Sequence, residues 1–148
     1  MRKLRESVSK TLLAALGISL IVAGIAQAQS DLPVFTGKFT LTTQVQWGQT
    51  ILRPGDYTLT IPSFSGATIA WVRDGGGRTV ACFMSGIDDR ESGTGNALLI
   101  REKDGQLRLY ALELGTVRRA LVYDRALARE AVTEARAPQT VPIILTKR

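Results

Sequence analysis

The densest group of acidic side chains in this 148-residue chain stands in one short segment. Asp88, Asp89 and Glu91 surround Arg90 and precede a Ser-Gly-Thr-Gly-Asn sequence that is typical of a loop between strands. Paired carboxylates can act as acid and base in sugar hydrolysis or supply oxygen ligands to calcium. The spacing matches no EF-hand loop, and Arg90 supplies a counter-charge. We therefore interpret the segment as a solvated loop, with weak calcium binding and catalysis as the alternatives.

A second candidate site is a pair of arginines predicted to face each other across a β-hairpin. The Lys-Asp-Gly-Gln sequence at 103–106 is typical of a type I′ turn, because Asp-Gly suits positive φ at both central positions. This turn places Arg101 directly opposite Arg108. Two cations on one wet face can hold a phosphate or sulfate. The simpler interpretation is two splayed, solvated side chains, with Asp104 or Glu113 taking part of the charge.

The chain has no histidine and a single cysteine, which narrows the chemistry open to it. Ser-His-Asp, Cys-His and histidine-based zinc sites are excluded, and one cysteine forms neither an internal disulfide nor a thiolate zinc site. Val80, Cys82 and Met84 alternate along a predicted strand, so we expect a buried, unreactive thiol. The residue types favour a protein that is not an enzyme and carries no metal or cofactor.

The elements that must position these residues are predicted to be strands, because apolar and polar residues alternate with a period of two. The clearest alternation runs from Phe39 to Trp47, and Pro54-Gly55 predicts a type II turn after it. Further strands are expected at 57–61, 67–73, 78–84, 96–103, 106–114 and 117–123. We predict an all-β fold, a small antiparallel sandwich or partly closed barrel of about eight or nine strands.

The last part of the chain departs from this alternation. Residues 124–137 carry a helical stripe of Leu127, Ala128, Ala131, Val132 and Ala135, with Asp124 as the N-cap and Pro138 as the stop. We therefore expect one C-terminal helix. A final strand at 141–146 contains a proline, which suits the edge of a sheet.

The first 28 residues have the order of features of a secretory signal peptide. A basic start leads into an apolar stretch, and the Ala-Gln-Ala that follows predicts cleavage between Ala28 and Gln29. The apolar stretch is shorter than the ~20 residues of a bilayer span, so we expect no membrane span after cleavage. Residues 29–148 then suffice for a single β-rich domain. We predict an exported protein, periplasmic or extracellular.

The leader also accounts for much of the positive charge of the chain. It holds four of the 19 Lys and Arg residues and one of the 13 Asp and Glu residues, so the net charge falls from +6 to +3 without it. The two signs then alternate along the chain instead of gathering in one stripe, which argues against a nucleic-acid partner.

Near the predicted mature N-terminus, the chain contains Phe35-Thr-Gly-Lys-Phe-Thr-Leu41, then Trp47-Gly48, then Leu52-Arg-Pro-Gly-Asp-Tyr-Thr58. By this F-x-G-x-F-x-L, W-G and L-x-x-G-D-Y-T pattern it resembles a group of small uncharacterised exported bacterial proteins. The resemblance covers roughly residues 35–61 and implies a β-rich exported domain. It implies no activity, cofactor or catalytic residue.

Three functions follow as hypotheses. The first is a non-enzymatic binding or structural module of the cell envelope, whose partner is an envelope or extracellular protein or a glycan. The second is a small barrel that carries an apolar ligand, because Phe39, Trp47, Tyr57 and Trp71 are expected to point inward. The third is a carboxylate-dependent enzyme acting on sugars through the acidic segment.

Overall fold

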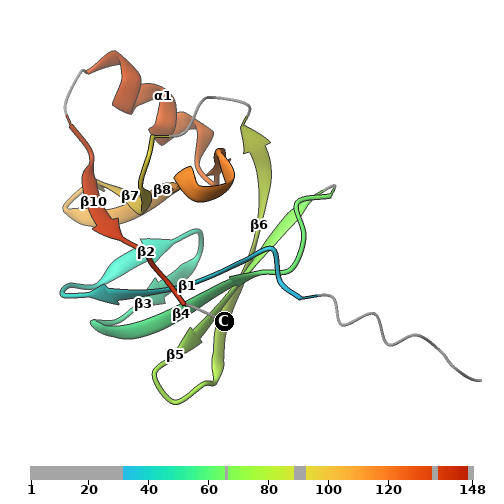
Figure 1. The fold of residues 1–148 in the computed structure, drawn as a ribbon. Helices are drawn as coiled ribbons and strands as arrows, with labels where there is room; N and C mark the ends of the chain where they lie inside the picture. Colours follow the sequence, from blue (N-terminus) through green and yellow to red (C-terminus); the bar gives the residue numbers. More distant parts are fainter. Residues whose placement is uncertain (1–31, 66, 89–92, 135–136, 147–148) are drawn as a thin grey trace, which may run out of the picture. The chain divides into compact units, whose positions relative to one another are not determined.

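The computed structural model describes residues 32–65, 67–88, 93–134 and 137–146 (Figure 1). The described part is built mostly from β-strands, as the alternating pattern predicts. There are eleven strands, one α-helix and one short 3-10 turn, arranged as two sheets that are not closed into a barrel within these residues. The all-β prediction is therefore confirmed, and the arrangement is that of a sandwich.

The first sheet is antiparallel, with the strand order β11, β1, β4, β5, β6. Its members are β1 (Phe35–Leu41), β4 (Gly55–Ile61), β5 (Thr68–Asp74), β6 (Thr79–Asp88) and the two-residue β11 (Ile144–Leu145).

The second sheet has the order β10, β7, β8, β9, with β2 parallel to β8 and β3 paired to β2. Its members are β2 (Val45–Trp47), β3 (Thr50–Leu52), β7 (Asn96–Lys103), β8 (Gln106–Leu114), β9 (Arg119–Val122) and β10 (Gln139–Pro142). The turn η1 (Gly115–Val117) joins β8 to β9.

Strand β6 belongs to both sheets. Residues 79–85 pair with β5 in the first sheet, and residues 86–88 pair with β9 in the second. Hydrogen bonding is therefore continuous from one layer to the other through this one strand, which forms a corner of the sandwich.

The chain also changes sheets at places where the sequence predicts one strand or a simple turn. The expected strand from Phe39 to Trp47 is wrong, because β1 ends at Leu41 and β2 begins in the other sheet at Val45. The period of two continues across this bend because both segments face the same core from opposite layers. The expected strand at 141–146 divides in the same way around the buried Ile143.

The Pro54-Gly55 segment is a crossover as well. It joins β3 of the second sheet to β4 of the first, and Gly55 has φ of 151°. The expected type II turn requires φ near +80° at this position, so that prediction is not met. Tyr57 donates its hydroxyl to the Arg53 carbonyl at 2.7 Å, which ties the crossover to the start of β4.

The hairpin between β7 and β8 confirms the predicted register. Asp104 and Gly105 have φ of 54° and 74°, as a type I′ turn requires, and Arg101 lies opposite Arg108. A register shift between Leu99 and Ile100 then places an extra residue in β8.

Helix α1 (Arg125–Thr133) packs on the face of the second sheet that points away from the core (Figure 1). The Asp124 side chain accepts a hydrogen bond from the Leu127 amide at 2.9 Å, so the predicted N-cap is confirmed. The helix is shorter than predicted and ends at Thr133. Val132 is exposed, so its place in the buried stripe was wrong.

Two further sequence predictions concern side chains on the first sheet and are wrong. Trp71 points outward with 39% of its surface exposed, and Cys82, its cross-strand partner, is exposed too. The inward positions of these strands are taken by Ala70, Val72 and Phe83. Small residues on β5 leave room for the large Phe83 ring, so core volume decided which face turned inward.

The predicted signal peptide and its cleavage site between Ala28 and Gln29 lie outside the described residues. From Leu32 onward the chain forms one compact unit. The one α-helix in the part of the chain that the structure describes has nine residues, fewer than a membrane-spanning helix needs.

Candidate functional site

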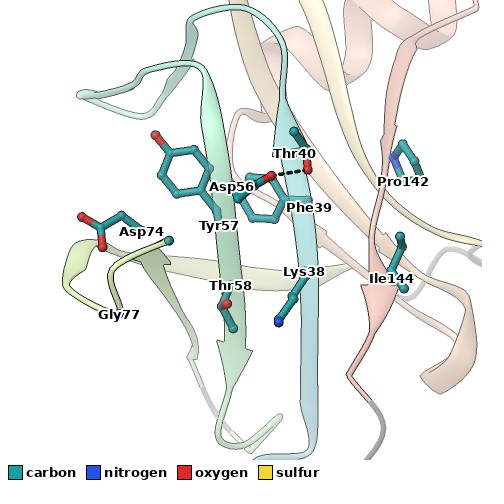
Figure 2. Close-up of a pocket in the computed structure, with 11 residues that line it drawn as sticks. Lys38, Phe39, Thr40, Asp56, Tyr57, Thr58, Asp74, Gly77, Pro142 and Ile144 are labelled. Atoms are coloured by element: carbon teal, nitrogen blue, oxygen red, sulfur yellow. Dashed lines mark hydrogen bonds between the residues drawn. The ribbon is translucent and has the colours of Figure 1, made fainter.

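A groove of about 600 Å³ lies on the outer face of the first sheet (Figure 2). Strands β1 and β4 form its floor. The turn between β5 and β6 borders one side, and Pro142 and Ile144 border the other. Segments far apart in the sequence therefore meet here.

Strand alternation explains why the floor of this groove is polar. Phe39 and Tyr57 turn into the core, so their neighbours in sequence turn outward. The outward set contains an ammonium group, two hydroxyls and a carboxylate: Lys38, Thr40, Asp56 and Thr58. The same alternation that builds the core thus places four hydrogen-bonding side chains in the groove.

Two of these side chains are joined across the strands. Thr40 lies opposite Asp56 and donates its hydroxyl to Asp56 Oδ1 at 2.6 Å. Lys38 lies opposite Thr58 in the next outward row. The Thr40 bond holds the Asp56 carboxylate in place, and a carboxylate has capacity for further donors.

Asp74, at the border of the groove, has a structural role. Its Oδ1 accepts the backbone amides of Gly76 and Arg78, each at 3.0 Å, and its Oδ2 accepts the Arg78 guanidinium. These hydrogen bonds, chiefly that from the Arg78 amide, lower the pKa of Asp74. Because both oxygens are used by the turn, Asp74 shapes the groove and is not a free acid or base.

Trp71 lies beside the groove on the same outer face. It pairs with Thr60, which follows Thr58 by two residues on β4, so the indole lies one outward row from the groove. Two residues of a strand span about 7 Å. Arg73 lies opposite Thr58 and so shares the row at the end of the groove. An exposed aromatic side chain therefore lies on the same outer face as the polar groove.

Arg101 and Arg108 lie opposite each other in the strand pairing, as predicted, but their side chains do not form one site. Arg101 lines a hollow beside α1 and pairs with Glu134, whereas Arg108 lines a different hollow beside Gln46 of β2. Both are on the face that α1 covers. Arg101 Nη1 and Arg108 Nε are buried without a hydrogen-bond partner among the described residues. The two side chains diverge to different hollows, but the expectation that they are solvated is wrong for Arg101, whose side chain is 13% exposed. Glu134 takes its charge instead of Asp104 or Glu113.

The acidic segment contributes little that can be described. Asp89 and Glu91 lie outside the described residues. Asp88 is the last residue of β6 and pairs with Ala120 of β9 through its backbone. Its predicted place in a loop is therefore corrected to a strand end. Among the described residues, no group of three His, Cys, Asp or Glu side chains is arranged to hold a metal ion.

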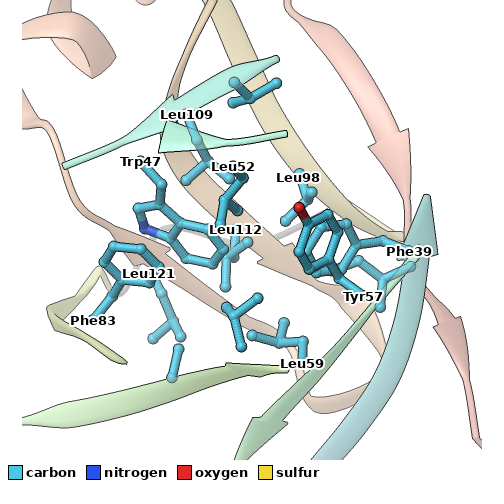
Figure 3. Close-up of a cluster of buried hydrophobic side chains, with 14 of the residues drawn as sticks. Phe39, Trp47, Leu52, Tyr57, Leu59, Phe83, Leu98, Leu109, Leu112 and Leu121 are labelled. Atoms are coloured by element: carbon cyan, nitrogen blue, oxygen red, sulfur yellow. The ribbon is translucent and has the colours of Figure 1, made fainter. Parts of the chain in front are cut away.

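The buried aromatic residues pack on one another (Figure 3). Trp47 stacks on Phe83 with ring centroids 4.2 Å apart, and Phe39 stacks on Tyr57 at 5.4 Å. Trp71, the fourth aromatic residue expected to line a cavity, is on the outside. These rings therefore fill the core and do not line the ligand cavity that the carrier hypothesis requires.

The sequence pointed to none of the groove residues as a site. The alternation along the predicted strands marked Lys38, Thr40 and Thr58 as solvent-facing, whereas Asp56 was expected to close the turn at Pro54-Gly55. Only the sheet topology makes β1 and β4 neighbours and places β11 beside them. A polar outward row on each strand was the available signal.

Comparison with known proteins does not place this chain in a family. It matches no protein-family model, no curated protein and no solved structure. The resemblance to small exported bacterial proteins remains a prediction, and the function must be argued from the groove itself.

Proposed function

We propose that this chain is an exported, non-enzymatic module that binds a glycan on the outer face of its first sheet. The observation that carries the proposal is the groove of about 600 Å³ with an ammonium group, hydroxyls and a carboxylate on its floor, together with the exposed Trp71 on the same face.

The groups in the groove match the chemistry of a sugar. A carboxylate accepts hydrogen bonds from sugar hydroxyls, an ammonium group donates them, and threonine does both. Asp56 is already oriented by Thr40, so less side-chain freedom is lost on binding. The C–H face of a sugar ring packs on an indole, and Trp71 offers one on the same surface.

The non-enzymatic part of the proposal rests on the carboxylates. A glycosidase needs two carboxyl groups on opposite sides of the scissile bond. In this groove Asp74 is engaged by the turn and Asp56 by Thr40. Export, the partner class and the absence of catalysis continue the expectations drawn from the sequence.

Tryptophan fluorescence of the purified protein tests the proposal. Trp47 is fully buried and Trp71 is partly exposed, so a ligand on the outer face changes the emission of Trp71 alone. Chito-, cello- and manno-oligosaccharides are the probes. We expect a saturable change with at least one of them and a Kd weakened about tenfold or more, or ~1.4 kcal/mol, by Asp56→Asn or Lys38→Ala.

Asp104→Asn is the matched control, because it makes the same change at a hairpin turn that accepts asparagine and lies outside the groove residues. It should leave the Kd unchanged. The proposal fails if no probe binds, or if binding is indifferent to both groove substitutions. Release of reducing sugar by the wild type, abolished in Asp56→Asn, would establish the enzyme alternative instead.

A further inference from the structure

One row of outward side chains on the first sheet, at the end of the groove, contains two cations. Lys38 on β1 lies opposite Thr58 on β4 (Figure 2), and Thr58 lies opposite Arg73 on β5. Neighbouring strands are about 4.8 Å apart, so the backbones of Lys38 and Arg73 are about 10 Å apart. Both side chains are long and exposed, so both can reach a group that lies over Thr58 between them.

These two cations have no counter-charge of their own. Among the described residues, neither Lys38 nor Arg73 forms an ion pair or a side-chain hydrogen bond. The strand segments that pair in the first sheet contain two carboxylates, Asp56 and Asp74. Asp74 is paired with Arg78, and Asp56 lies about 7 Å away along β4, in the next row. The row therefore presents positive charge that the protein does not balance.

The position of this row suits a chain of sugars that lies along β4. The row on one side of it contains Thr40 and Asp56, which offer hydrogen bonds to sugar hydroxyls. The row on its other side contains Thr60 and the exposed Trp71. Such a chain therefore meets polar groups of the groove, then the two cations, then an aromatic side chain.

We propose that the glycan bound by this sheet is acidic, and that a carboxylate on one of its sugars binds between Lys38 and Arg73 while another ring packs on Trp71. This inference rests on the proposed glycan binding and adds its substrate class. A guanidinium group donates two parallel hydrogen bonds to a carboxylate, and an ammonium group attracts it as a compact charge. The Thr58 hydroxyl can donate a further hydrogen bond.

Pairs of oligosaccharides that differ only in the acid group test the inference. Cello- and manno-oligosaccharides are the neutral members. The acidic members have the same linkage and length, with each primary hydroxyl oxidised to a carboxylate. Titration followed by tryptophan fluorescence gives the Kd of each. We expect the acidic member of at least one pair to bind about tenfold or more tightly at low ionic strength, and this ratio to shrink in 1 M salt because the site is exposed.

Substitutions at Arg73 test whether this row causes the preference. Arg73→Gln should lower the ratio of the two Kd values about fivefold or more, whereas Arg73→Lys, which keeps the charge, should give an intermediate ratio. Arg125→Gln is the matched control, because it makes the same change at an exposed arginine at the start of α1. It should leave the ratio unchanged. Thermal unfolding should show that these exposed substitutions leave the fold intact.

The outcomes separate this inference from the proposed function. Equal Kd values within every pair overturn the acidic-glycan inference and leave glycan binding standing, whereas no binding by any probe overturns both. A preference that Arg73→Gln leaves unchanged also overturns the inference. Acetate and inorganic phosphate distinguish a glycan from a free anion. If either displaces the acidic oligosaccharide at an equal concentration of acid groups, the row binds a free anion and the inference is wrong.

Discussion

The indole of Trp47 lies flat on the ring of Phe83, with centroids 4.2 Å apart and planes 6° from parallel. Trp47 belongs to β2 of the second sheet, and Phe83 belongs to the part of β6 that pairs in the first. Tyr123, the residue after β9, meets Trp47 edge-on at 5.0 Å. These three rings therefore hold the two layers together where β6 crosses between them.

Loss of the Phe83 ring should weaken the packing between these two layers. We expect Phe83→Ala to lower the free energy of unfolding by about 3–5 kcal/mol, because it leaves a cavity against Trp47. Met84→Ala, at the next residue but exposed, should cost less than ~1 kcal/mol. Urea denaturation measures both. Equal effects would show that the stack does not stabilise the fold.

The Tyr123 hydroxyl is buried and has no hydrogen-bond partner among the described residues. Tyr123→Phe should therefore be neutral or stabilising by up to ~1 kcal/mol at pH 7. Tyr57→Phe is the control, because the Tyr57 hydroxyl donates to the Arg53 carbonyl and its loss should destabilise the protein. Urea denaturation measures the free energy of unfolding of both variants. It should stay equal or rise in Tyr123→Phe and fall in Tyr57→Phe.

Tyr123 should also make stability depend on pH in the alkaline range. Burial raises the pKa of Tyr123 well above its ordinary value, because the charged phenolate would lose its hydration. In the unfolded chain a tyrosine ionises near pH ~10, so above that pH the unfolded state binds fewer protons than the folded state. Stability falls there by up to ~1.4 kcal/mol per pH unit. Tyr123→Phe should lose this component, and parallel pH profiles of wild type and variant between pH 9 and 11 would contradict the prediction.

The two ion pairs between the β7–β8 hairpin and α1 differ in burial. The Arg101 side chain is 13% exposed where it pairs with Glu134, whereas the side chains of Lys103 and Glu130, 2.8 Å apart, are 36% and 44% exposed. Glu134→Gln should destabilise the protein by about 1–3 kcal/mol, because it leaves a desolvated guanidinium without a counter-charge. Glu130→Gln should have a smaller effect that disappears in 1 M salt. Urea denaturation at low and high salt compares the two variants.

Two glycines near the β7 start give a test of backbone packing. A Cβ on Gly115 would lie 2.5 Å from the Gly93 carbonyl oxygen, and backbone atoms cannot yield cheaply. A Cβ on Gly95 would meet no atom within 4 Å. Gly115→Ala should cost about 1–3 kcal/mol, whereas Gly95→Ala should be neutral or slightly stabilising. Calorimetric unfolding of both variants checks the difference, and a harmless Gly115→Ala would contradict the close approach.

The sequence predicted local structure correctly where residues close together in the chain decide it. The Asp104-Gly105 turn set its own register, which put Arg101 opposite Arg108. The Asp124 cap likewise started α1 where predicted. Each depends on backbone angles or hydrogen bonds within a few residues, so no distant segment can alter it.

The direction of side chains on β5 and β6 was not readable in the same way. Both faces of these strands carry apolar residues, so a period of two does not say which face turns inward. The answer came from Phe83, whose ring fits against Trp47, a residue far away in the sequence. The exposure of Trp71 and Cys82 follows from that choice.

The sequence by itself determined that this protein is built from alternating strands, how its tightest hairpin pairs and where its helix begins. Only the tertiary structure decided which strands are neighbours, that β6 serves two sheets, and that the polar rows of β1 and β4 form a groove. The physical reason is that turns and caps are settled by short-range backbone energies. Sheet order and side-chain direction are settled by filling one shared core, to which segments remote in sequence contribute at once.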